Sequence, residues 1–116
     1  MKQLAPSILS ADFICLGEQL KQLQKLCIHY LHIDVMDGMF VPSISFGMPV
    51  IASLRKHTDM FFDVHLMIEE PIRYVNALRQ AGADGLTVHA EACADLPGTI
   101  AAIRESGAKP AVCLSP

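Results

Sequence analysis

Three polar residues in two largely apolar stretches of this sequence could act together. His32 and Asp34 stand two positions apart in LHIDVMDG, and His65 lies in FFDVHLM. Both stretches are typical of buried β-strands, and side chains two positions apart on a strand point to the same face. Two imidazoles and a carboxylate on neighbouring strands form a ligand set of catalytic Zn²⁺ and non-haem Fe²⁺ sites. The pattern therefore indicates a metal site, in which Asp34 could alternatively act as a general base.

The same residues also have a purely structural interpretation. Two core histidines could hydrogen-bond to each other and to Asp34, and neither spacing is as specific as a CxxC pair. Met36 and Met67 follow two positions after Asp34 and His65. These methionines could line a reacting centre or simply fill the core. The pattern by itself leaves both interpretations open.

The elements that must position these residues follow an alternating plan. Five short segments rich in apolar and β-branched residues are expected strands: LAPSIL, YLHIDVM, FFDVHLM, GLTVHA and PAVCL. Segments of helical period separate them. On the strands, one face is apolar, whereas the opposite face carries His32, Asp34, His65 and His89 toward the C-terminal ends. Strand and helix in regular alternation predict a parallel sheet with right-handed crossovers.

Four helices are expected between these strands. We expect Asp12 to cap the first, the second to occupy about residues 48–56, and Gly82 and Gly107 to follow the third and fourth. Prolines 71 and 97 suit the first turns of the last two helices. The expected buried positions of the first, third and fourth helices are Phe13, Leu16, Leu20 and Leu23; Ile72, Val75 and Leu78; and Ile100 and Ile103.

Parallel βα units build either an open doubly wound sheet or a closed barrel. No GxG turn follows the first expected strand, which favours barrel-type units over a dinucleotide-binding sheet. A complete (β/α)₈ barrel takes about 250 residues, and this chain has 116. We therefore expect an α/β fold of the (β/α)₈ TIM-barrel type, here the first half, (βα)₄ plus a fifth strand, as one domain over residues 1–116. Its open edges predict a homo-oligomer or a C-terminal half outside this chain.

Composition excludes several classes of function. The net charge of −3 without a basic block argues against a nucleic-acid partner. No apolar run approaches the roughly 20 residues of a transmembrane helix, and the N-terminus lacks a signal-like segment, so we expect a cytoplasmic protein. The four cysteines form no CxxC pair, and we expect them to be reduced core residues.

Four segments resemble a known family. APSILSADF, HIDVMDGMFVP, DVHLMIEEP and AGADGLTVHAEA, in this order and spacing, are similar to the N-terminal half of the ribulose-phosphate 3-epimerase family, over Leu4 to Pro116. The resemblance implies a (β/α)₈ barrel that interconverts the sugar phosphates D-ribulose 5-phosphate and D-xylulose 5-phosphate in the pentose phosphate pathway. It also implies a divalent cation, Zn²⁺ or Fe²⁺ first and Mn²⁺ or Co²⁺ as further options.

The resemblance assigns roles to individual residues. His32, Asp34 and His65 match three of four metal ligands, and Asp34 also matches one of two acid/base carboxylates that act through an enediolate. Ser7 matches a serine that contacts substrate, and His65 also matches a substrate-contacting residue. Met36 and Met67 match methionines that line the pocket. We therefore expect a catalytic Asp34 in a metal-dependent site.

The family's second carboxylate and its phosphate-binding loops lie on later strands. We therefore expect weak or no turnover from this chain alone. Two other functions stay open: epimerisation of a related ketohexose 6-phosphate, or an inactive fragment that serves as a binding or oligomerisation module.

Overall fold

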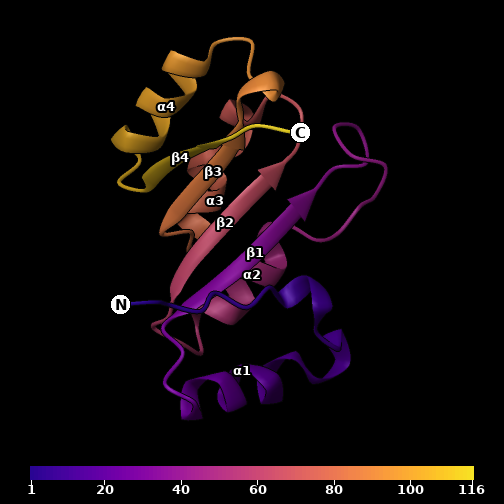
Figure 1. Cartoon of the computed structure of the whole chain (residues 1–116), viewed down its shortest axis with the longest axis vertical. Helices are drawn as coiled ribbons and strands as arrows, with labels where there is room; N and C mark the ends of the chain where they lie inside the picture. Colours follow the sequence, from indigo (N-terminus) through magenta and orange to yellow (C-terminus); the bar gives the residue numbers. More distant parts are fainter.

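The computed structural model describes residues 1–116 and contains one parallel sheet of four strands (Figure 1). The strands are β1 (Tyr30–Met36), β2 (Phe61–Met67), β3 (Gly85–His89) and β4 (Lys109–Cys113). Their spatial order follows the chain, β1-β2-β3-β4, and each neighbouring pair is parallel. This arrangement confirms the expected α/β fold and corresponds to the first half of a TIM barrel.

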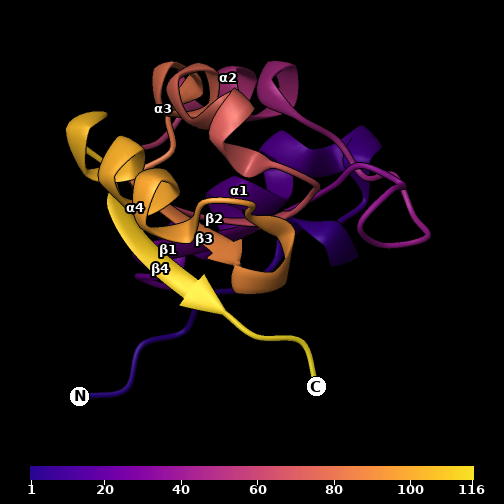
Figure 2. The same cartoon turned by 90° about the horizontal axis from the view of Figure 1, so that it is seen from above.

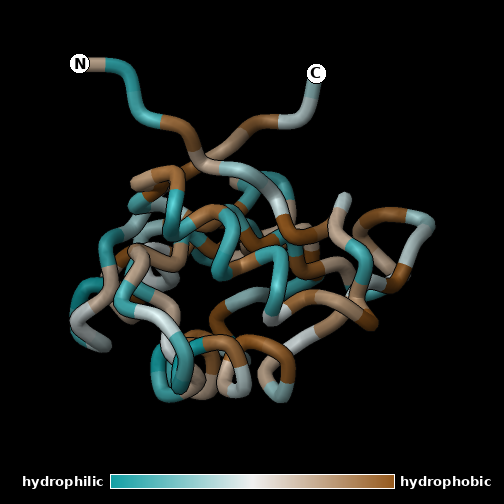
Figure 3. Tube along the Cα trace, turned by 90° about the horizontal axis from the view of Figure 1, so that it is seen from below, coloured by the Kyte–Doolittle hydropathy of each residue, from teal (hydrophilic) through white to brown (hydrophobic).

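The helix α1 (Leu16–Lys25) precedes β1, and three α-helices connect the strands: α2 (Met48–Arg55), α3 (Val75–Ala81) and α4 (Leu96–Glu105). Figure 2 shows α2, α3 and α4 on one side of the sheet, whereas both chain ends leave on the other side, as Figure 3 also shows. Short 3₁₀ segments lie at Ile8–Ser10, Phe13–Cys15, Pro71–Tyr74 and Ala90–Ala92. None of the helices is both long and apolar enough to cross a membrane.

The first expected strand, LAPSIL, is not a strand. Ser7 forms one isolated parallel bridge with His32, whose backbone N–H donates to the Pro6 carbonyl at 2.9 Å. The chain then turns at once into the 3₁₀ segment from Ile8, where the Ser7 hydroxyl accepts the Leu9 N–H. Pro6 has no N–H to donate, so pairing cannot extend through it. The segment still places Ser7 beside β1.

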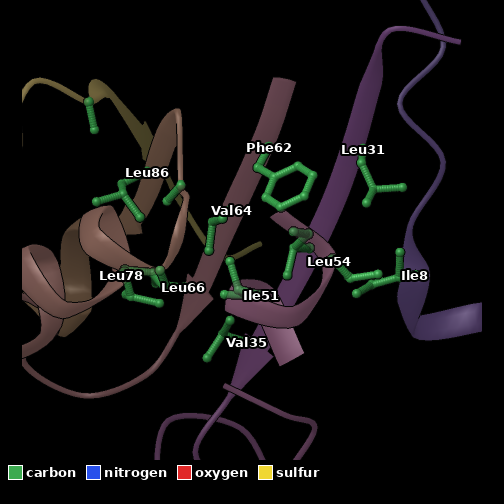
Figure 4. Close-up of a cluster of buried hydrophobic side chains, with 14 of the residues drawn as sticks. Ile8, Leu31, Val35, Ile51, Leu54, Phe62, Val64, Leu66, Leu78 and Leu86 are labelled. Carbon is green, nitrogen blue, oxygen red and sulfur yellow. The ribbon is translucent and has the colours of Figure 1, made fainter. Parts of the chain in front are cut away.

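Alternation along the strands creates the core. The helix-facing residues of β1 and β2, Leu31, Ile33, Phe62, Val64 and Leu66, are completely buried. Figure 4 shows Leu31, Phe62, Val64 and Leu66 among the side chains that pack with Ile51 and Leu54 from α2 and Leu78 from α3, and Ile33 belongs to the same buried cluster. Each fully buried Leu, Ile, Val or Phe contributes about 1.5–3 kcal/mol of transfer free energy. The apolar face predicted from the sequence is therefore confirmed.

The helix boundaries agree with most of the expected signals. The Asp12 carboxylate accepts the Ile14 N–H and so caps the 3₁₀ segment Phe13–Cys15 that leads into α1, whereas α1 itself starts after Cys15 without a side-chain cap; Gly82 follows α3 with φ of 130°. Two expected core positions are wrong. Phe13 and Ile72 are 54% and 41% exposed because each lies in a 3₁₀ turn that precedes its α-helix, which rotates it off the buried stripe.

Arg55 at the end of α2 holds together the loops at the N-terminal ends of β2 and β3. Its guanidinium donates to the carbonyls of Thr58, Met60 and Gly82 and to the Asp84 carboxylate, at 2.7–3.1 Å. A side chain on Gly82 would collide with Arg55, since an added Cβ would lie 2.4 Å from its Cδ. This half-buried ion pair therefore connects two βα units.

We expect Arg55→Ala to lower the free energy of unfolding by about 2–3 kcal/mol, because it removes the guanidinium from three carbonyls and leaves Asp84 with only the Phe62 N–H and the more distant Arg79. Arg55→Lys should recover only part of this loss, since one ammonium cannot reproduce the planar fork. Urea denaturation measures both, with exposed Arg104→Ala as a control that changes stability by less than about 0.5 kcal/mol. Equal stability of Arg55→Ala and the wild type would contradict a stabilising role of the Arg55 hydrogen bonds.

Candidate metal and active site

The polar face of the sheet lies opposite the helices, as parity predicted. His32 and Asp34 on β1 and Asp63 and His65 on β2 alternate with the buried core residues and are half-buried themselves. The strands pair so that Asp34 lies directly beside His65 and His32 beside Asp63. Register and alternation together gather four ionisable side chains into one cluster.

Asp34 is the centre of this cluster. One of its carboxylate oxygens, Oδ1, lies 3.1 Å from His32 Nε2 and 3.3 Å from His65 Nδ1. Its other oxygen, Oδ2, accepts a hydrogen bond from the Ser7 hydroxyl. The isolated bridge of Ser7 to β1 explains this contact. The structure thus brings together the predicted residues Ser7, His32, Asp34 and His65.

The donor set fits a divalent cation. One ligand atom each from His32, Asp34 and His65 lies within 4.8 Å of the others. Two imidazoles and one carboxylate with open positions suit Zn²⁺ or Fe²⁺. The three side chains are 26%, 13% and 19% exposed, so solvent reaches the cluster, unlike a sealed pair of core histidines.

Asp63 is a further functional candidate on this face, which the sequence analysis did not single out. Its Oδ2 lies 2.9 Å from His32 Nδ1, the ring nitrogen that faces away from Asp34. Metal-binding histidines commonly donate their second N–H to a carboxylate, which fixes the ring and its tautomer. Asp63 therefore orients His32 toward Asp34. Strand alternation could have placed Asp63 on the polar face. Its pairing with His32 follows only from the register between β1 and β2.

A third histidine extends the cluster across β3. His89 is buried, and its Nε2 lies 2.8 Å from His65 Nε2. Burial, the neighbouring His89 and His32 lower the pKa of His65, although Asp34 opposes the shift. A lowered pKa keeps His65 neutral near pH 7, which is the state that binds a metal.

Glu91 lies beyond His89, with Oε1 3.4 Å from His89 Nδ1. Hydrogen bonds from Ser115, chiefly, lower the pKa of the exposed Glu91 carboxyl to about 2. The Ser115 hydroxyl also lies 3.3 Å from His89 Nδ1. The C-terminal residues after β4 therefore cover this end of the cluster.

Met36 and Met67 pair side by side at the C-terminal ends of β1 and β2, and both are half-buried. They therefore lie next to the polar cluster, one residue pair beyond it on the same face. The expected contact of both residues with substrate stays a prediction.

The loop after β1 is tied to the loop after β2 through Asp37. Its Oδ1 accepts the N–H groups of Met39 and Phe40, and its Oδ2 accepts the N–H of Glu69, each at 2.9 Å. Desolvation alone would raise the pKa of Asp37, but these backbone donors outweigh it and lower the pKa. The same loop covers His89, because the Phe40 ring lies 4.9 Å from the His89 ring. Asp37 therefore shapes the rim of the site.

All four cysteines are free thiols, as expected. Their expected core location is wrong for Cys15 and Cys27, which are exposed, and for Cys113, which is half-buried, whereas half-buried Cys93 packs against the core. Cys27 has a positive φ of 58° directly after α1, and Cys113 ends β4 at the open edge of the sheet.

Comparison with known proteins adds an independent line of observation. The "Ribulose-phosphate 3 epimerase family" model matches residues 3–116. Ribulose-phosphate 3-epimerase of Bacillus subtilis is 53% identical over 116 residues, which are 100% of this chain and 54% of the relative. The Rhodobacter capsulatus protein of the same name is 46% identical over 98% of this chain and 50% of its own length. The chain spans about half the length of the curated relatives that it matches.

Two further matches concern location and fold. The "Ribulose-phosphate 3-epimerase, cytoplasmic isoform" of Oryza sativa is 44% identical over 98% of this chain and 50% of its own length. Among solved structures, 7,8-dihydropteroate synthase from Vibrio fischeri superimposes with a TM-score of 0.63 at 12% identity, over 97% of this chain and 44% of that chain. At this identity the structural likeness bears on the fold alone.

We expect Asp37→Asn to lower the free energy of unfolding by about 1–2 kcal/mol at pH 7, because an amide NH₂ cannot accept all three backbone N–H groups. The pKa of Asp37 is lower in the folded protein than its ordinary value of 3.8. Ionised Asp37 therefore stabilises the fold fully at pH values above 3.8, and this stabilisation is lost as the pH falls through the lower pKa of the folded state. The stability difference between wild type and variant should therefore shrink below about pH 4.

Urea titrations at pH 7 and at pH 3 measure this difference, and Asp59→Asn at an exposed loop position is the control. A difference that grows on acidification would contradict the role given to the Asp37 carboxylate.

Proposed function

Because the chain belongs to the ribulose-phosphate 3-epimerase family, we propose that it forms the half of a barrel that begins the 3-epimerisation of D-ribulose 5-phosphate to D-xylulose 5-phosphate. One observation carries the proposal: Asp34 lies between two imidazoles, 3.1 Å from His32 and 3.3 Å from His65, at the end of the sheet where parallel βα folds build active sites. A cytoplasmic location, which the name of the rice relative carries, is part of the proposal.

In the proposed reaction, Asp34 removes the proton from C3 of the substrate. His32, Asp34 and His65 would hold a Zn²⁺ or Fe²⁺ ion, which supplies Lewis-acid polarisation of the neighbouring C2 carbonyl. A carboxylate beside a cation stays ionised at neutral pH and can therefore accept a proton. Asp34 would thus combine a ligand role with a base role through its two oxygens.

The remaining predicted residues would surround the substrate. The Ser7 hydroxyl donates to Asp34 Oδ2, so it fixes the orientation of the base and lies where it can reach a substrate oxygen. Met36 and Met67 supply an apolar wall beside His65, which keeps water from the reacting carbon. We propose all three as positioning and substrate-contact residues.

Inversion at C3 requires a proton from the opposite side of the carbon. Asp63 is the other carboxylate on the polar face of β1 and β2. It bonds to His32, and the His32–Asp63 pair precedes the Asp34–His65 pair by two residues along the strands. It is therefore a poor candidate for the second proton carrier. We propose that this carrier comes from outside the described strands, from further barrel strands or from a second copy of the chain.

Solvent exchange at C3 tests Asp34 without requiring inversion. We expect the chain with Zn²⁺ or Fe²⁺ to exchange the C3 proton of ribulose 5-phosphate for deuterium in D₂O. The loss of the C3 proton signal in proton NMR measures this exchange. Asp34→Asn, assayed at a cation concentration that saturates the variant, should lose about 100-fold or more in exchange rate. Asp59→Asn, which removes an exposed carboxylate, should exchange as the wild type does.

Equal exchange by Asp34→Asn and the wild type would assign the base to another residue. Cation-independent exchange in the wild type would remove the metal from the proposal.

Metal affinity tests the ligand assignment separately from activity. In a Cys113→Ser background, which removes a neighbouring thiol as a competing ligand, His32→Ala and His65→Ala should each weaken Zn²⁺ binding by at least about tenfold, and Asp63→Asn should weaken it by about 10- to 100-fold because His32 loses its orienting partner. Competition with a chromophoric chelator gives the dissociation constants, and exposed His57→Ala is the matched control. Unaltered affinity in both histidine variants would reduce His32 and His65 to structural residues.

A further inference from the structure

A second group of potential ligands lies on the far side of His65 from Asp34. His65, His89 and Cys113 come from three adjacent strands, β2, β3 and β4, and their ligand atoms lie within 4.8 Å of one another. His89 and Cys113 are direct neighbours in the β3–β4 register. The Nε2 atoms of the two histidines are 2.8 Å apart.

Each of these histidines has a carboxylate at its other ring nitrogen. Asp34 Oδ1 lies 3.3 Å from His65 Nδ1, and Glu91 Oε1 lies 3.4 Å from His89 Nδ1. A carboxylate beside Nδ1 favours the tautomer that carries its proton there. The 2.8 Å between the two Nε2 atoms is the length of a hydrogen bond in which one nitrogen donates and the other accepts, and the loss of that single proton offers the lone pairs of both nitrogens to a cation beside them.

Cys113 supplies a soft third ligand. Its thiol is free and half-buried, and its contact with the Leu114 carbonyl, at 3.8 Å, is weak. Two imidazoles and one thiolate favour Zn²⁺, Co²⁺ or a similar borderline cation over Mg²⁺ or Ca²⁺. We propose that His65 Nε2, His89 Nε2 and Cys113 Sγ form a second cation site, for Zn²⁺ or a cation of similar softness.

The two sites share one imidazole and therefore compete. A cation at the Cys113 site leaves the proton of His65 on Nδ1, where it donates to Asp34, whereas the Asp34 site needs the lone pair of that same nitrogen. Filling both would strip His65 of both ring protons and place two dications on one ring. We infer that one cation per chain occupies either site, so that a soft cation held by Cys113 withdraws His65 from Asp34.

Cobalt titration of the full chain tests this proposal, because only a site with a thiolate ligand gives the near-ultraviolet thiolate-to-Co²⁺ charge-transfer absorption. We expect this band in the wild type at one Co²⁺ per chain, and its retention in His32→Ala, which damages only the Asp34 site. Cys113→Ser should lose the band and still bind one Co²⁺ through the Asp34 site. Cys93→Ser, which removes another half-buried thiol, should keep the band.

A wild type without the band, a band that survives in Cys113→Ser, or two Co²⁺ ions per chain would each overturn the proposal. The proposal requires these three donors and not the epimerase reaction, so the two fail separately. A Cys113-dependent band would leave the second site standing, and the absence of C3 exchange in Cys113→Ser as well as in the wild type would overturn the proposed activity. C3 exchange without a Cys113-dependent band would overturn the second site and leave the proposed activity standing.

Discussion

The parallel register of β1 and β2 is the constraint on which the site depends. It places Asp34 beside His65 and His32 beside Asp63, and on the other face it leaves Ile33 and Val64 completely buried. A slip of one residue would exchange the two faces of a strand and put a histidine into the apolar core. The burial that stabilises the sheet therefore also fixes how His32, Asp34 and His65 lie relative to one another. A sequence change that shifts the register would alter both the core and this polar cluster.

The two ends of the sheet divide stability from chemistry. At the N-terminal end of the strands, Arg55 and Asp84 join loops through charge-assisted hydrogen bonds. At the C-terminal end, the polar cluster is half-buried and the loop containing Asp37 is held by backbone N–H donors. Strong contacts far from the cluster allow its side chains to remain partly open to solvent, which is the distribution expected of βα folds.

The sequence predicted what depends on local periodicity. Alternation assigned His32, Asp34 and His65 to one face, and the apolar residues between them to the other, because strand parity follows from the chain alone. LAPSIL failed because its pairing depends on a neighbour 25 residues away and stops at Ser7. The His32–Asp63 contact required the register between two strands. Exposed Phe13 required knowing that a 3₁₀ turn precedes α1.

His65 joins the two ligand groups because its ring has two nitrogens and the sheet places a different partner at each. Asp34 lies on the Nδ1 side and His89 on the Nε2 side. A neutral imidazole carries one proton, so whichever nitrogen holds it decides which group can bind a cation. Residues that influence His89, such as Glu91 and Phe40, thereby influence Asp34 without contacting it. The tautomer of one histidine thus couples Asp34 on β1 to the edge of the sheet at β4.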